Sequence, residues 1–360
     1  MWALFAACSL AMAGPPRAGV PALIEFGWDE PSTRYLRDHI AEMERMPFDG
    51  VVLNAHYRDA QGRDAVLEWT GFGREVISWE ALQSALADLK ATRFHRFTQN
   101  FLRFNTTPGD VDWFDDFSAI LHNARMAARL ARQGRLKGLL FDIEQYNFPL
   151  FTFEKRKYAE RTFSEYEQQV RRRGEEVMQA FQQEYPGLTV FMTFGYALAG
   201  RTREDFARTS YGLLGPFLDG LYAAARGRTV IVDGWEMSYP YHTADQFEAA
   251  YRRMHEEGAS LSAVPHQYRR HLSAGFGIWM DLDWRNRGWN AEDPSKNPRT
   301  PQDLEAVLYA ALHRCDHYVW LYCEQPRWFP PQKLPDAYIK AVRAARTASG
   351  MKNPKDVAAP

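Results

Sequence analysis

Two carboxylates end one of the most apolar segments of this 360-residue chain. Residues 138–144 have the sequence Gly-Leu-Leu-Phe-Asp-Ile-Glu, which predicts a buried strand. Side chains alternate along a strand, so Asp142 and Glu144 are expected to point the same way. Unpaired carboxylates are unfavourable inside a core. We therefore expect this pair at the C-terminal mouth of the strand, with Glu144 as a catalytic general acid/base and Asp142 as its catalytic partner.

Acidic, amide and aromatic side chains follow most of the other segments that are predicted as strands. Like charges at close range raise the pKa of one carboxyl group, which keeps it protonated near neutral pH. A pair of this kind, one acid and one carboxylate, is what hydrolysis of a glycosidic bond requires. The candidates for the second catalytic carboxylate are Glu236, Glu324 and Asp281, and those for substrate binding are Trp28, His56, Asn100, Tyr196, Tyr239, Asp281 and Trp320.

A structural role is the simpler explanation for some of these residues. An Asp at the end of a strand often caps the following helix, and this explanation applies to Asp29 and Asp283. A single His such as His56 is often only hydrogen-bonded. A catalytic role is favoured most strongly for Glu144, which follows an apolar run and has Asp142 on the same face.

Eight apolar, strand-like segments alternate with amphipathic helical segments along the chain. Apolar residues run continuously through them, as in strands that are covered on both faces. This alternation predicts a single (β/α)8 TIM barrel, an α/β fold, with long loops at the C-terminal face. A doubly wound open sheet is the alternative, and no Gly-x-Gly-x-x-Gly motif follows the first strand to support it. The predicted strands are 22–28, 50–56, 94–101, 136–144, 188–196, 229–237, 275–283 and 317–324.

Local signals predict where helices begin and where the loops are long. Ser164 and Glu167 have the spacing of a capping box and predict a helix over 164–185. Thr300 followed by Pro301 predicts a second helix start, with Thr as the cap. The loops 57–78, 145–163 and 283–299 follow the second, fourth and seventh strands, so a barrel would place them around the active-site face. They carry Trp69, Phe148, Phe151, Phe153, Trp284 and Trp289.

Composition narrows the class of partner. The chain has 44 Lys and Arg against 45 Asp and Glu, so no basic face is indicated and nucleic-acid binding is not expected. Aromatic residues make up 14% of the chain, with 11 Trp and 17 Tyr, and several of the Trp fall near predicted strand ends. Aromatic faces at the mouth of a pocket suit sugar rings. Core packing accounts for at least half of them.

The N-terminal residues 1–13 predict a secretory signal peptide, with an apolar run and an Ala-Met-Ala site before Gly14. Lipidation at Cys8 is disfavoured because the apolar run before it would be very short. No later segment is long and apolar enough to span a membrane. We expect a secreted or periplasmic protein with one catalytic domain over 20–346 and a flexible tail over 347–360.

Metal and cofactor signatures are missing from the sequence. After removal of the signal peptide the remaining cysteines are Cys315 and Cys323, which are expected to be buried thiols rather than a disulfide. No Cys-x-x-Cys pair and no His/Cys cluster has zinc spacing. We therefore expect no cofactor and no metal ligand set.

The segment around Glu144 resembles the signature of glycoside hydrolase family 18, Asp-Gly-x-Asp-x-Asp-x-Glu. Gly138, Asp142 and Glu144 match it, whereas Lys137 and Leu140 stand where the family has Asp. Met237-Ser238-Tyr239 is similar to the family's Met-x-Tyr-Asp, with Pro240 in place of the Asp, and Trp320 matches a Trp of the barrel floor. The resemblance implies that Glu144 is the acid and that Asp142 and Tyr239 hold an N-acetyl group, whose oxygen would be the nucleophile.

Strand parity favours a different second group. On an unbroken strand Glu236 and Tyr239 face opposite ways, unless a bulge at Gly234 changes the register. If Glu236 serves the site, a two-carboxylate mechanism with Glu144 is favoured.

These observations together predict an exported glycoside hydrolase that cleaves a polysaccharide or glycan by carboxylate acid/base catalysis. One alternative is a metal-dependent TIM-barrel enzyme, with a divalent ion ringed by His56, Asp142, Glu144, Glu236, Asp281 and Glu324. The other is a glycan-binding barrel without activity. The sequence leaves open the sugar and its linkage, endo or exo action, the stereochemistry and the oligomeric state.

Overall fold

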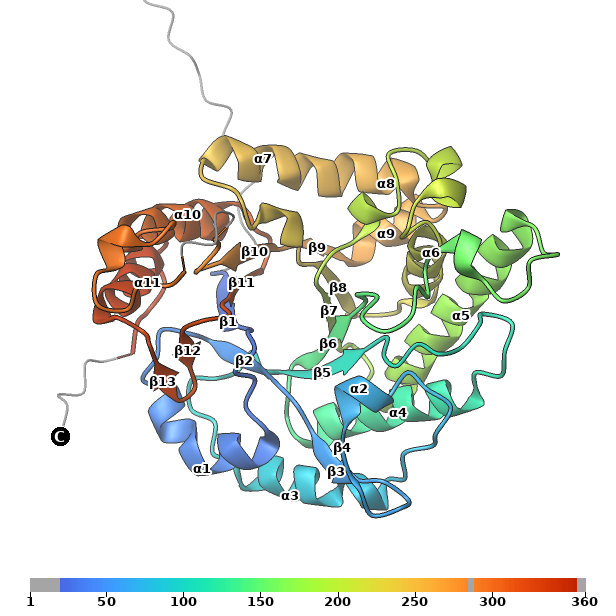
Figure 1. The fold of residues 1–360 in the computed structure, drawn as a ribbon, viewed down its shortest axis with the longest axis horizontal. Helices are drawn as coiled ribbons and strands as arrows, with labels where there is room; N and C mark the ends of the chain where they lie inside the picture. Colours follow the sequence, from blue (N-terminus) through green and yellow to red (C-terminus); the bar gives the residue numbers. More distant parts are fainter. Residues whose placement is uncertain (1–19, 284–287, 355–360) are drawn as a thin grey trace, which may run out of the picture.

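Parallel strands form a barrel at the centre of the molecule, with helices around it (Figure 1). The structure is a computed structural model, and it describes residues 20–283 and 288–354. Each barrel strand pairs in parallel with the next one along the chain, and the eighth returns to the first, where Ile24 pairs with Trp320. The predicted (β/α)8 TIM barrel is therefore confirmed. The barrel strands are β1 (Ala22–Glu25), β2 (Gly50–Leu53), β5 (Phe101–Asn105), β6 (Gly138–Asp142), β7 (Thr189–Met192), β8 (Val230–Asp233), β9 (Leu272–Ala274), β10 (Phe276–Trp279) and β11 (Tyr318–Tyr322).

The seventh barrel strand is made of two short pieces. β9 pairs with β8 and β10 pairs with β11, and only Gly275 separates them in the chain. Gly277 of β10 faces the indole of Trp320, because a Cβ at this position would come within 2.7 Å of the ring. The absence of a side chain at Gly277 makes room for Trp320.

Helices surround the barrel and alternate with its strands (Figure 1). A hairpin of β3 (His56–Arg58) and β4 (Asp64–Val66) follows β2, and a second hairpin, of β12 (Arg327–Trp328) and β13 (Pro331–Gln332), follows β11. The helices are α1 (Thr33–Met43), α2 (Leu67–Thr70), α3 (Gln83–Ala91), α4 (Ser118–Gln133), α5 (Phe163–Glu184), α6 (Leu214–Ala224), α7 (Ala244–Arg252), α8 (Gly258–Leu261), α9 (Pro265–His271), α10 (Pro301–Arg314) and α11 (Asp336–Ala348).

Helix starts follow the capping chemistry of the sequence. Thr300 accepts a hydrogen bond from the backbone of Asp303 and Pro301 opens α10, as predicted. The capping box of α5 is formed by Thr162 and Glu165 rather than by Ser164 and Glu167. The helix therefore begins one residue before its predicted start.

The core has two layers. An inner cluster fills the barrel and includes Phe101, Leu140, Phe191 and Trp320. A larger outer cluster lies between the strands and the surrounding helices. Both faces of each strand are therefore buried, which explains the continuous apolar runs of the sequence.

The structure describes less of the N-terminus than of the C-terminus. The predicted signal peptide, 1–13, lies outside the described residues, as do 355–360. The predicted tail starts within α11, and Met351 is buried, so 347–354 packs on the domain instead of leaving it. Among the described helices, none has the length and apolar character required to cross a membrane.

Candidate active site

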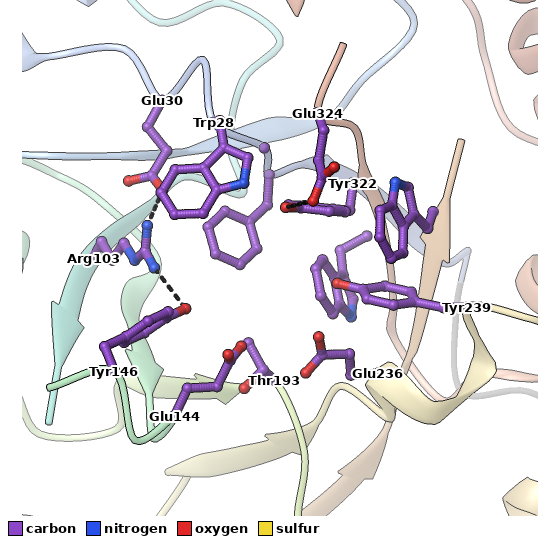
Figure 2. A pocket seen from close by; sticks show the side chains of 14 residues that line it. Trp28, Glu30, Arg103, Glu144, Tyr146, Thr193, Glu236, Tyr239, Tyr322 and Glu324 are labelled. Carbon is purple, nitrogen blue, oxygen red and sulfur yellow. Dashed lines mark hydrogen bonds and ion pairs between the residues drawn. The ribbon is translucent and has the colours of Figure 1, made fainter. Parts of the chain in front are cut away.

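A pocket of about 160 Å³ opens where the barrel strands end, and acidic and aromatic side chains line it (Figure 2). Six of the sequence candidates line this pocket: Trp28, Glu144, Glu236, Tyr239, Trp320 and Glu324. The other lining residues are Phe26, Gly27, Glu30, Arg103, Tyr146, Thr193, Trp279 and Tyr322.

Glu144 enters the pocket from the end of β6. The strand ends at Asp142, whose Oδ1 accepts a hydrogen bond of 3.0 Å from the backbone N–H of Glu144. The hydroxyl of Thr106 donates to the carbonyl of Glu144 at 3.3 Å. Both bonds fix the backbone on which the Glu144 carboxyl group is carried.

Asp142 supports Glu144 without lining the pocket. Its side chain is 0% exposed, and Oδ2 accepts bonds from Arg103 at 2.7 Å and from the Tyr146 hydroxyl at 2.9 Å. With Oδ1 already bonded to the backbone of Glu144, no oxygen of Asp142 is left without a partner. Asp142 therefore pairs with an Arg of the neighbouring strand, and its oxygens are occupied by donors of the protein itself.

Glu236 reaches the pocket because its strand ends early. β8 stops at Asp233, Trp235 takes a left-handed conformation with φ 40°, and a 3-10 turn follows over Glu236–Ser238. The backbone N–H of Glu236 then bonds the carbonyl of Thr193 on the neighbouring strand's loop at 3.0 Å. Glu236 and Tyr239 both line the pocket, contrary to the expectation from strand parity, because neither residue lies on a strand.

The carboxyl groups of Glu144 and Glu236 point into the same part of the pocket, with Thr193 between them (Figure 2). Burial raises the pKa of Glu144 to about 9, and the charges of Asp142 and Glu236 add to this effect. Burial raises the pKa of Glu236 to about 7, again with a contribution from Asp142. Glu236 therefore ionises first, and Glu144 keeps its proton at neutral pH.

Arg103 is the main functional residue that sequence reasoning missed. It bonds both Asp142 and Glu30, and these acids raise its pKa above the usual range although burial opposes them. The third strand was predicted at 94–101, but β5 spans Phe101–Asn105, so Arg103 was placed in a loop. A buried Arg inside the apolar run Phe101–Asn105 was the signal that could have located it.

Three further lining residues were also missed. Tyr146 bonds Asp142 and lies within 3.3 Å of Arg103. Burial raises the pKa of Glu30 to about 8, against the opposing effect of Arg103. The Thr193 side chain is 1% exposed, and its hydroxyl has no hydrogen-bond partner among the described residues.

Aromatic rings form the walls of the pocket. Trp320 donates a hydrogen bond of 2.8 Å to the carbonyl of Gly234, which fixes its indole at the barrel floor. Tyr239 packs against Trp320 and Trp279, with ring centroids 5.4 Å apart in each pair. Trp28 is 53% exposed at the mouth. Flat apolar faces of this kind can cover the faces of a sugar ring.

Glu324 lies at the rim and Asp281 holds it there. The side chain of Glu324 accepts a bond of 3.1 Å from the Tyr322 hydroxyl. Asp281 is buried, and its carboxylate accepts the backbone N–H groups of Glu324 at 3.0 Å and Gln325 at 2.7 Å. Asp281 does not line the pocket, and its carboxylate holds the backbone of the rim instead.

Three other predicted binding residues lie away from the pocket. His56 begins the β3–β4 hairpin and is exposed, because β2 ends at Leu53. Asn100 precedes β5, where its side chain bonds the backbones of Val51 and Phe97. Tyr196 is buried and bonds Asp219 at 2.7 Å. Each lies outside the pocket because the strand concerned ends or begins earlier or later than its apolar run.

The metal ring of the alternative hypothesis is not assembled by the described residues. His56 lies outside the pocket, and Asp142 and Asp281 are occupied by N–H donors. Within the residues that the structure describes, the one group of three close His, Cys, Asp or Glu ligands is elsewhere, at Glu25, Asp29 and Cys323. Cys315 and Cys323 are both buried and are not joined by a disulfide, as predicted.

Comparison with known proteins yields only distant structural similarity. No protein-family model and no curated protein matches the chain. A glycoside hydrolase family 5 enzyme from Prevotella bryantii has 10% identity and a TM-score of 0.47, covering 88% of each chain. A broad-specificity endoglucanase from an uncultured bacterium has 13% identity and a TM-score of 0.48, covering 90% of this chain and 86% of its own.

The sequence identity between this chain and a sugar epimerase is as high as that between this chain and the hydrolases. The 3-keto-D-glucoside 4-epimerase of E. coli has 13% identity and a TM-score of 0.42, covering 90% of this chain and 98% of its own. Similarity at this level does not distinguish the two activities. The function must therefore be argued from the site itself.

Proposed function

We propose that this protein is a glycoside hydrolase in which Glu144 is the general acid and Glu236 the second carboxylate. The observation that carries the proposal is the pair of carboxyl groups in one aromatic pocket, with pKa values raised to different extents. Different environments assign different roles to two carboxyl groups. Glu144, the more strongly shifted, donates a proton to the leaving oxygen, and Glu236, which ionises first, acts on the sugar or on water.

The site favours this two-carboxylate mechanism over assistance by an acetamide of the substrate. An assisted mechanism needs a group that orients the acetamide, and the resemblance assigns that task to Asp142. In the structure Asp142 is 0% exposed and its oxygens accept bonds from Arg103, Tyr146 and the backbone of Glu144. Glu236, by contrast, lines the pocket and faces Glu144 across Thr193 (Figure 2).

The charges of the pocket favour a neutral or cationic sugar over an anionic one. Four acids line it, Glu30, Glu144, Glu236 and Glu324, and the cation among the described lining residues is Arg103. Arg103 is already paired with Glu30 and Asp142, so it is not available to bind a sugar carboxylate. The volume of about 160 Å³ is also small beside the roughly 300–1,000 Å³ of drug-sized ligand sites. We propose that one sugar ring enters the pocket.

The site of action is proposed from the sequence. The apolar N-terminal residues 1–13 support export, and a polysaccharide or glycan outside the cytoplasm is then the substrate.

A screen of the purified protein against a glycan panel tests the proposed function. The panel should hold neutral, amino-sugar and uronic-acid polysaccharides together with aryl glycosides, with release of reducing ends as the readout. We expect cleavage within the neutral or amino-sugar members and none within the uronic acids. Binding to a glycan without cleavage of any member would favour the glycan-binding barrel instead.

A further inference from the structure

Three potential metal ligands converge behind the wall of the pocket, in a place that the proposed hydrolysis does not use. Glu25 ends β1, Asp29 lies in the loop that follows, and Cys323 follows β11. One ligand atom from each residue lies within 4.8 Å of the other two. The three residues come from opposite ends of the chain, which explains why no motif predicted them.

The burial of the Glu25 carboxyl group requires an explanation. Its side chain is 0% exposed, and no N–H or hydroxyl group of the described residues donates to its carboxyl oxygens; the contact that its carboxyl group makes is with a second acid, Asp29. Asp29 lies beside it, and the Oδ1 atom of Asp29 is also buried without an N–H or hydroxyl donor among the described residues. A buried acid is unfavourable unless a cation or a proton compensates it.

The nearby cation compensates this acid only in part. The charge of Arg327 of β12 favours the ionised form of Glu25, but no N–H group of Arg327 donates a hydrogen bond to the Glu25 carboxyl group. The other oxygen of Asp29, Oδ2, accepts the backbone N–H of Phe329 at 3.1 Å. Asp29 is therefore fixed by the β12 hairpin while Oδ1 faces the cluster.

The space between these ligands is bounded by oxygen atoms around Gly27. A Cβ on Gly27 would lie 2.9 Å from Asp29 Oδ1, 2.9 Å from the carbonyl of Cys323 and 3.3 Å from Glu25 Oε1. Gly27 has no side chain, so these oxygens approach one another at this point. The thiol of Cys323 adds a soft donor to this oxygen set.

From these contacts we propose that Glu25, Asp29 and Cys323 form a structural zinc site. Carboxylate oxygens and a cysteine sulfur are ligands that Zn²⁺ accepts together, whereas Ca²⁺ and Mg²⁺ take oxygen ligands only. The ion gives the two buried carboxylates a directly bound positive charge in addition to the more distant charge of Arg327. It joins the end of β1 to the end of β11.

The zinc site has a consequence for the pocket. Trp28 and Glu324 both line the pocket, and each is the chain neighbour of a proposed ligand, Asp29 and Cys323. The ion therefore holds two neighbouring segments of the rim together. It takes no part in bond cleavage, so the proposal is independent of the proposed hydrolase activity.

Zinc content is the direct test. Protein prepared without chelators or metal resins should carry about one zinc ion per chain by mass spectrometry of the metals, and chelator should lower its melting temperature until ZnCl2 is added back. Cys323→Ser and Glu25→Gln should lose the zinc. Cys315→Ser, which alters the other buried cysteine, should retain it.

Thermal unfolding of Glu25→Gln separates the zinc site from a metal-free acid pair. If two acids merely share a proton, the introduced amide replaces that proton as a donor to Asp29, and the melting temperature rises. If zinc is bound, the same change lowers it. The proposal is overturned if protein with and without added ZnCl2 contains no stoichiometric zinc, or if it binds Ca²⁺ instead and Cys323→Ser still binds it.

Discussion

The guanidinium of Arg103 donates a hydrogen bond of 2.7 Å to Asp142, both residues being buried. Asp142 in turn accepts the backbone N–H of Glu144 at 3.0 Å. The position of Glu144, the proposed acid, therefore depends on the ion pair between Arg103 and Asp142. This pair can act without touching the substrate.

Arg103→Met should destabilise the fold strongly. It leaves Asp142 and Glu30 buried without their cation, and breaking a buried pair costs about 3–5 kcal/mol. The free energy of unfolding in urea measures the loss. Arg171→Met is the matched control, because Arg171 pairs with Glu175 on the surface of α5 and its removal should cost about 0–1 kcal/mol. Equal losses in the two variants would contradict a central role of the Arg103 pair.

The pH dependence of kcat/KM should be bell-shaped. Activity requires Glu236 ionised and Glu144 protonated, so it should rise as the pH passes about 7 and fall as it passes about 9. Initial rates over pH 5 to 11 (roughly two units beyond each limb) with one neutral substrate measure both limbs. A rate that stays constant through pH 10 would show that Glu144 is not the proton donor.

Glu144→Gln should stabilise the protein increasingly with pH. The pKa of Glu144 is about 9 in the folded protein and lies above its value in the unfolded chain. As the pH rises from about 4.5 to 9, the unfolded wild-type chain releases this proton while the folded protein keeps it, so the folded state loses stability. The slope is at most about 1.4 kcal/mol per pH unit, and less after screening in the partly open pocket. Gln at position 144 does not titrate, so the variant lacks this pH-dependent loss of stability. Parallel stability curves for the two proteins between pH 5 and 9 (roughly the same window) would contradict the raised pKa.

Thr193→Val should reduce turnover without reducing stability. The Thr193 hydroxyl is buried between the two carboxyl groups, without a partner among the described residues, so removing it relieves an unpaired polar group and takes a donor from the substrate. We expect kcat to fall about tenfold and the melting temperature to stay equal or rise. Thr189→Val, at the other end of β7, controls for the change of side chain. A stable Thr193→Val variant with wild-type kcat would exclude a role for the hydroxyl.

The fold was predictable from the sequence because continuous apolar runs identify strands that are covered on both sides. The exact strand ends were not. Apolar residues continue past the end of the strand at Met192, which placed Tyr196 in the site although its hydroxyl bonds Asp219 of α6. The third strand was placed too early, and this one shift exchanged Asn100 for Arg103.

The candidate carboxylates were predictable to different degrees. Glu144 follows a strand that was placed almost correctly, so its position in the pocket agreed with expectation. Glu236 depends on the left-handed turn at Trp235, which alternation along a strand does not predict. Asp281 was chosen for its charge, but its oxygens face the backbone N–H groups of Glu324 and Gln325.

The central claim, that Glu144 is the general acid, is tested most directly by the turnover of Glu144→Gln on a substrate that the glycan panel identifies. With the fold intact by circular dichroism, kcat should fall by about 10²–10⁴-fold, the contribution of a positioned acid. Glu154→Gln, a change of an exposed Glu in the loop after β6, should keep wild-type kcat. A folded Glu144→Gln enzyme with kcat close to that of wild type would contradict the claim.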